Sequence, residues 1–134
     1  MAELEGQIRW QAATTSALAS AAVAGLDLPA RVRGDGGATL ELCEELAIDD
    51  PAYRVVRGVL TLPGARTGVP VELDLNPYVR SRLELGLRPT PRRRLRQRGR
   101  GFAYATAAHE VLDRLAGELA AAAEATLPPI EQAA

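Results

Sequence analysis

The sequence contains no lysine, so all sixteen of its basic residues are arginine. It also contains a single cysteine, Cys43, and a single histidine, His109. One cysteine excludes an internal disulfide, and one cysteine with one histidine is too few for a zinc site built from those ligands. We therefore expect neither a disulfide-stapled protein nor a metal or other cofactor.

Aromatic residues and long apolar runs are also scarce. The longest weakly apolar stretch, residues 17–28, is too short and too rich in alanine to span a bilayer, so we expect no membrane partner. The opening MAELEGQIRW lacks the basic start and apolar core of a signal peptide, which predicts a cytoplasmic location. Alanine, leucine and valine must supply most of the core, because there are only five aromatic residues: Trp10, Tyr53, Tyr78, Phe102 and Tyr104.

A length of 134 residues suits one domain with a single core. The hydroxyls of residues 14–16 can satisfy free backbone N–H groups, so a short helix is predicted from about Ser16 to Ala24, with Gly25 as its stop. We expect residues 1–127 to form this domain and residues 128–134 to be a frayed tail.

The middle of the chain predicts antiparallel strands. Residues 53–62 are rich in β-branched side chains. Residues 69–75 alternate between apolar and polar, which places Glu72 and Asp74 together on the polar face. Pro70 cannot donate a ladder hydrogen bond, so we expect residues 69–75 to be an edge strand or to contain a bulge.

Three segments fit more than one structure. Residues 38–47 and 77–86 can each be a strand or a helix; we favour a strand for 38–47 and a strand over 80–88. Residues 3–13 fit either a strand or the start of a helix.

A long helix is predicted from about residue 102 to residue 125. Glu110 and Arg114 have the spacing of a supporting helix pair. A core stripe is predicted from Tyr104, Ala108, Val111, Leu112, Leu115, Leu119 and Ala122. Such a helix can cover the apolar face of a sheet, which predicts an α+β fold: a curved antiparallel sheet of about four to six strands, a long C-terminal helix over it and a shorter N-terminal helix. This order of elements is similar to that of the helix-grip lipid- or ligand-binding domains.

Positive charge is concentrated in one part of the chain. Residues 80–100 hold nine arginines and one acid, a net charge of +8, whereas residues 1–79 carry −5 and residues 101–134 carry −4. Either the fold neutralises this band internally, or the band faces an anionic partner. The candidate anion-binding or partner-binding residues are Arg82, Arg88, Arg92, Arg93, Arg94, Arg96, Arg98 and Arg100.

Few residues suggest chemistry. Glu72 and Asp74 can share acid and base roles, although a solvated ion ladder is the simpler interpretation. His109 can act as a base, with Asp113 four residues on to orient it, although a structural or exposed histidine is more common. We interpret Cys43 as a buried small residue or an inert thiol, because its acidic neighbours raise the pKa of a thiol.

The sequence therefore favours a small, non-enzymatic binding protein whose arginine-rich end engages an acidic protein surface or a small anionic ligand. One alternative is a helix-grip-like enzyme, or a lipid- or polyketide-type binding domain, with an acid–base site in a pocket. Another is nucleic-acid binding through residues 88–100, which the missing lysines and base-stacking aromatics disfavour. The small first helix and an edge strand also allow a homodimer.

Overall fold

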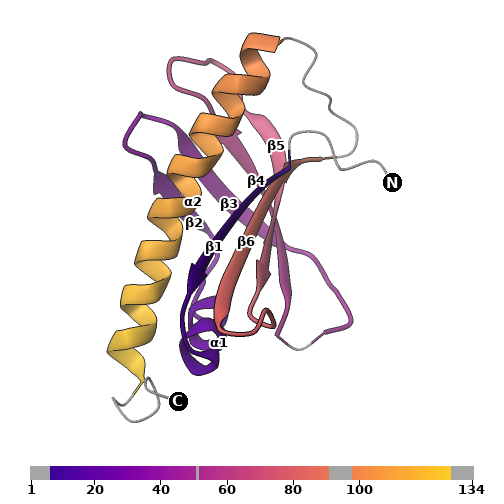
Figure 1. The fold of residues 1–134 in the computed structure, drawn as a ribbon. Helices are drawn as coiled ribbons and strands as arrows, with labels where there is room; N and C mark the ends of the chain where they lie inside the picture. The colour runs from indigo at the N-terminus through magenta and orange to yellow at the C-terminus, as the bar shows by residue number, and fades with distance from the viewer. Residues whose placement is uncertain (1–6, 51, 91–97, 128–134) are drawn as a thin grey trace.

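A computed structural model describes residues 7–50, 52–90 and 98–127 of the chain, with the backbone alone for 98–102. Within these residues, six antiparallel strands form one curled sheet, a half-barrel that packs against a long C-terminal helix and a shorter N-terminal one (Figure 1). The predicted α+β class is confirmed. The predicted tail at 128–134 lies outside the described residues.

The chain crosses the sheet once and then returns strand by strand. Along the sheet the strands lie in the order β1-β6-β5-β4-β3-β2, so α1 and its connections carry the chain from one edge to the other. The elements are β1 (Ile8–Ala13), α1 (Ser16–Ala24), β2 (Ala30–Arg33), β3 (Thr39–Glu45), β4 (Arg54–Thr61), β5 (Val69–Asn76), β6 (Arg82–Pro89) and α2 (Arg98–Thr126).

Local chemistry explains where α1 begins and ends. The hydroxyl of Thr15 accepts a hydrogen bond from the backbone N–H of Leu18 at 3.2 Å, as an N-cap residue does. At the other end, the N–H of Gly25 donates to the carbonyl of Ala21. The predicted bounds of this helix are confirmed.

The expectation of an edge strand or a bulge at Pro70 is wrong, because β5 lies between β4 and β6 and pairs with both in an unbroken register. Pro70 is near the beginning of β5, and its carbonyl accepts a hydrogen bond from the N–H of Thr90, just beyond β6. In an antiparallel ladder the N–H and carbonyl of one residue point to the same neighbour. The N–H that Pro70 lacks would therefore point toward Thr90, where the β5–β6 ladder ends, so its loss removes no bond from the middle of the sheet.

The expectation that Cys43 is buried is also wrong. Cys43 follows buried Leu42 on β3, so the alternation of the strand places it on the exposed face, and the register between β3 and β4 shifts beside it, between Leu42 and Glu44. Its thiol lies 3.5 Å from the carbonyl oxygen of Arg57. Gly58, opposite Leu42, allows the close approach, because a Cβ there would collide with the backbone of Glu41.

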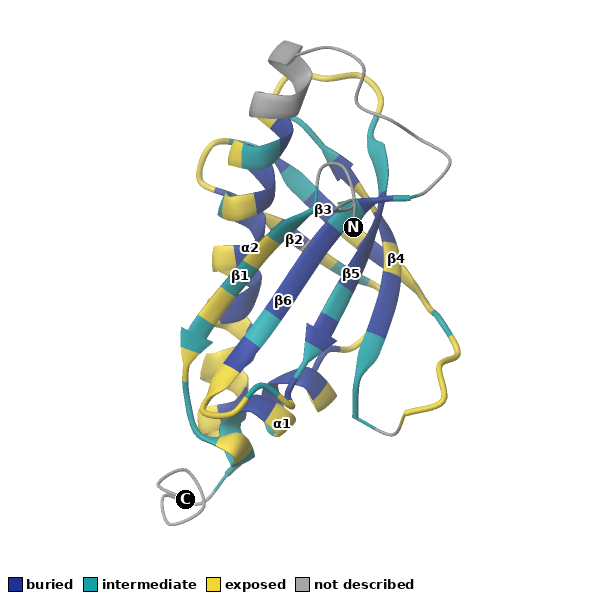
Figure 2. Ribbon diagram, turned by 45° about the vertical axis from the view of Figure 1, so that its right-hand side comes forward, coloured by how far each residue is buried: buried dark blue, intermediate teal, exposed yellow. Residues whose placement is uncertain are grey.

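The core lies between α2 and one face of the sheet, and Figure 2 shows the buried segments of β4, β5 and β6 in dark blue. Of the predicted stripe on α2, Ala122 is exposed and Ala123 is buried in its place. The sheet contributes large buried residues: Leu40, Leu42, Val56, Leu60, Val71, Leu73, Leu75, Leu85 and Leu87.

The ambiguous segments became strands because each found a pairing partner. Residues 8–13 pair with Arg82–Leu87 of β6, 39–45 pair with β4, and 82–89 pair with β5. The predicted pairing of Glu110 with Arg114 is wrong. Glu110 Oε2 instead accepts a hydrogen bond from the N–H of Gly36, and Arg114 Nε donates to Glu118.

Candidate functional site

A cavity of about 150 Å³ lies where β1, β6, α1 and α2 meet. Its inner wall is buried and apolar, and includes Ala22, Leu83 and Ala116. Its mouth reaches exposed residues, including Ala120 and Glu124. We call it the alanine cavity; its lining is Trp10, Ala12, Ala13, Thr14, Leu18, Ala22, Leu83, Ala116, Ala120 and Glu124.

Small side chains create this space. Ala116 and Ala120 are four residues apart and therefore lie on one face of α2, while Ala22 faces them from α1. A methyl group at each position leaves a gap that a leucine would fill. The alanines thus determine the size of the cavity, and the backbones of α1, α2 and β1 determine its shape.

Trp10 anchors the edge strand to α2 beside the cavity. Its indole Nε1 donates to Asp113 Oδ1 at 3.3 Å, at the long end of hydrogen-bond range. Asp113 is therefore engaged with Trp10, rather than placed only to orient His109. The contact holds β1 against the helix and keeps the tryptophan in the cavity wall.

The predicted acid pair lies on the other face of the sheet. Glu72 and Asp74 alternate along β5 with Leu73, which is buried in the core, so both point away from α2. Arg88 on β6 bridges them, with Nη2 2.9 Å from Glu72 Oε1 and Nη1 3.2 Å from Asp74 Oδ2. Arg57 adds a longer contact of 3.6 Å to Glu72. The four side chains form an ion ladder across three strands.

This ladder is less solvated than the sequence predicted. Only 7% of Glu72 is exposed, although it lies on the outer face. Burial raises the pKa of Asp74, and the positive charge of Arg88 opposes that effect. Burial and the negative charge of Asp74 also raise the pKa of Tyr53, which lies close to it. The cluster is a neutralised patch in which both carboxylates already have a cationic partner.

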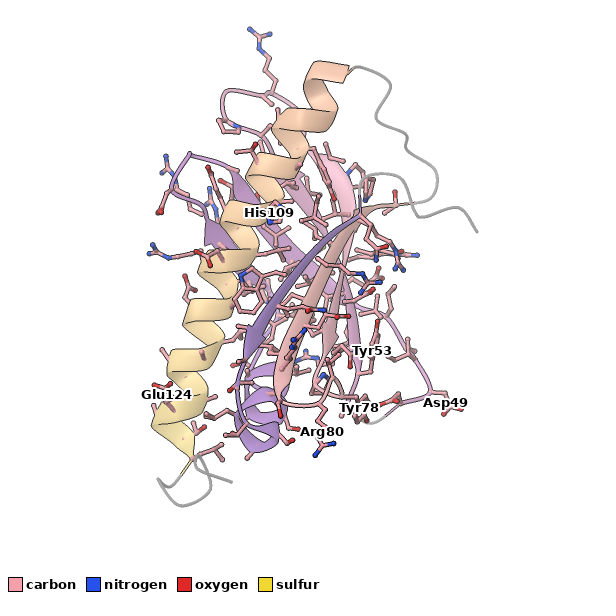
Figure 3. All side chains as sticks on the ribbon, viewed as in Figure 1. Asp49, Tyr53, Tyr78, Arg80, His109 and Glu124 are labelled. Carbon is pink, nitrogen blue, oxygen red and sulfur yellow. The ribbon has the colours of Figure 1, made fainter. Side chains whose placement is uncertain are left out.

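His109 is exposed on α2 (Figure 3), rather than at the edge of the core. Neither it nor Glu72 nor Asp74 lines the alanine cavity. The structure therefore does not bring the three acid–base candidates together, and their use in catalysis stays a prediction.

Two of the candidate arginines are engaged within the chain. Arg88 bridges the two acids of β5, and Arg82 donates to Gln11 Oε1 at 3.0 Å. The other six belong to parts whose side chains lie outside the described residues: Arg92, Arg93, Arg94, Arg96, Arg98 and Arg100.

Across the described ranges, no group of three or more His, Cys, Asp or Glu side chains is placed to hold a metal ion. None of the described helices combines the length and the apolar character needed to cross a bilayer.

No protein-family model matches the chain, and no curated protein or solved structure matches it significantly. The site is therefore described from its own residues.

The sequence analysis missed the alanine cavity. Its lining comes from four separated segments, and alanine in a helix is an ordinary helix former. The one usable signal in the sequence was the small side chains of the first helix, such as Ala21 and Ala22, which leave little to fill the space beside a neighbouring element.

Proposed function

We propose that the protein binds a small apolar ligand in the alanine cavity and performs no chemistry on it. The observation that supports this most directly is the cavity itself: an opening of about 150 Å³ between the sheet edge and both helices, with a buried apolar wall. The element order, similar to that of helix-grip binding domains, supports the same proposal.

The volume indicates the size of ligand. An apolar cavity of roughly 150 Å³ in another protein stays dry and binds benzene, so a single six-membered ring fits here. Leu18, Leu83 and the alanines offer dispersion contacts to such a ring. The polar side chains of the lining are Thr14, Glu124 and the indole N–H of Trp10, which already has a partner. The lining contains no histidine or cysteine, the side chains that most often act as a base or a nucleophile.

Binding of an anionic partner by the arginine-rich end remains a prediction. The engagement of Arg82 and Arg88 within the sheet reduces what they can contribute to it.

Trp10 makes the proposal directly testable. It is the only tryptophan of the chain and it lines the cavity, so all indole fluorescence comes from the site. Titrating toluene into the full chain, with excitation above the absorption of toluene, should change this emission saturably. For a ligand of seven heavy atoms we expect a Kd of about 0.1–1 mM. Toluene should also raise the melting temperature of the protein, because it binds the folded state and not the unfolded chain.

Two leucine substitutions on α2 provide the contrast. Ala120→Leu places a larger side chain at the cavity mouth and should weaken toluene binding by about tenfold or more. Ala121→Leu adds the same side chain at an exposed position that does not line the cavity and should bind like the wild type. If toluene gives no saturable signal, or if both variants bind equally, the proposal is wrong.

A further inference from the structure

The alanine cavity combines an apolar wall with one ionised side chain. Of its ten lining residues, Glu124 alone carries a charge, and it lies at the exposed end, near the C-terminal end of α2 (Figure 3). The rest of the lining is apolar except for Trp10 and Thr14. A ligand that fills the cavity with a ring must therefore place its polar end beside a carboxylate.

The end of α2 around Glu124 carries no positive side chain. No basic residue follows Arg114 on α2 as far as Thr126, and the preceding acid, Glu118, is paired with Arg114. The C-terminal end of a helix adds the partial negative charge of its free carbonyls. α1 carries no charged side chain that could offset this.

Two features could favour an anion instead, and both are weak. Thr14 precedes the N-terminal end of α1, where a helix carries about half a positive charge. However, the Thr15 hydroxyl already accepts from Leu18 N–H, and Thr14 N–H donates to the carbonyl of Ser81. Arg82 pairs in register with Ala13, but it donates to Gln11 on the outer face of the sheet.

From this charge complementarity we infer that the ligand is a small cationic amine: an apolar ring inside the cavity, with an ammonium group at Glu124. This inference rests on the proposed function. Glu124 already takes part in an interaction within the chain. An ionised carboxylate has about four acceptor positions, so an ammonium can bind it alongside that interaction.

Three probes with the same ring separate charge from shape: toluene, benzylamine as a cation and benzoate as an anion, each titrated at pH 7 against Trp10 fluorescence. A partly exposed charge pair predicts that benzylamine binds about five- to tenfold more tightly than toluene. Benzoate should bind more weakly than toluene. The preference for benzylamine should shrink as salt is added, because salt screens the pair.

Glu124→Gln should lower benzylamine affinity to about that of toluene and change toluene affinity less than about twofold. Glu118→Gln is the matched control: it removes the same charge from the same helix at a residue that does not line the cavity. If toluene binds but benzylamine binds no more tightly, or if the two variants behave alike, the amine inference is wrong while the proposed function stands. If toluene does not bind, the proposed function and the inference that rests on it are both wrong.

Discussion

The carboxylate of Glu110 on α2 accepts a hydrogen bond of 2.9 Å from the backbone N–H of Gly36 in the β2–β3 turn. A Cβ at Gly34 would lie 2.9 Å from the Cβ of Glu110, and a Cβ at Gly36 would collide with its carboxylate. The two glycines therefore let the turn close directly onto the helix. This contact holds α2 against one edge of the sheet, while Trp10 holds it against the other.

Gly34→Ala should destabilise the protein by about 1–3 kcal/mol, because the added methyl group would lie 2.9 Å from the Cβ of Glu110, which the backbone of α2 holds in place. Urea denaturation measures this free energy of unfolding. Gly117→Ala is the control: a Cβ there meets nothing within 4 Å, and alanine favours a helix. It should stabilise the protein by about 0.5–1 kcal/mol. A Gly34→Ala variant as stable as the wild type would contradict this close contact between the turn and α2.

Arg54 joins the end of α1 to the sheet. Its Nη1 donates to the carbonyls of Val23 and Leu26, at 2.7 and 2.8 Å, and its Nε donates to Glu45 at 2.9 Å. Arg54→Ala should cost about 2–3 kcal/mol in urea denaturation, because it removes the side-chain donor from the carbonyls of Val23 and Leu26 and breaks the pair with Glu45. Arg54→Lys should recover only part of this, since an ammonium lacks the planar fork. Full recovery by lysine would show that charge alone matters.

The interaction of Glu45 with Arg54 should stabilise the protein less in acid than at neutral pH. Its hydrogen bond to Arg54 lowers its pKa below the ordinary value of 4.5. The unfolded chain then binds the proton more readily, so the pair stabilises the fold above about pH 4.5 and the benefit is lost as the pH falls through the lowered pKa. The stability difference between the wild type and Glu45→Gln, measured at pH 3–7, should therefore shrink in acid. A difference that is constant with pH would exclude this linkage.

The titration of Asp74 should change the stability of the protein with pH in the opposite direction. Because burial raises its pKa, the folded state binds the proton more readily than the unfolded chain does. Its contribution to stability should fall as the pH rises from its ordinary value of 3.8 through the raised pKa. Asp74→Asn removes this titration, so the stability of the wild type relative to that variant should decrease from acid toward neutral pH. An increase would contradict burial as the dominant effect.

Tyr104 is buried, and within the described residues its hydroxyl has no hydrogen-bond partner. Burial raises its pKa above the ordinary value of 10.0. A buried hydroxyl without a partner costs free energy, so Tyr104→Phe should be neutral or stabilise the protein by up to about 1–2 kcal/mol. Thermal unfolding measures the effect. A loss of stability greater than about 1 kcal/mol would show that the hydroxyl is hydrogen-bonded in solution.

Much of the fold follows from interactions between near neighbours in the sequence. Thr15 caps α1 through a contact three residues away, and the stripe from Tyr104 to Leu119 predicts which face of α2 is buried. The alternation of Val69 to Leu75 likewise predicts that Glu72 and Asp74 share the outer face. These predictions needed only the periods of a helix and a strand.

Other features depended on partners far along the chain. Residues 8–13 are a strand because residues 82–87 offer them a ladder, some 75 positions later. Pro70 predicted an edge strand, but β5 is an inner strand. The missing N–H of Pro70 is tolerated there because the β5–β6 ladder ends beside it at Thr90. Sequence periodicity carries no information about which segments meet, so it could not decide either case.

By itself, the sequence determined the two helices, the strands around residues 53–62 and 69–75, and the shared face of Glu72 and Asp74, because each rests on local spacing. Only the tertiary structure decided that Arg88 neutralises Glu72 and Asp74, and that four separated segments enclose the alanine cavity. Ala116 and Ala120 look like ordinary helix formers until α1 and β1 pack beside them. Their small size then leaves a cavity, because a cavity is a property of several elements packed together and of none alone.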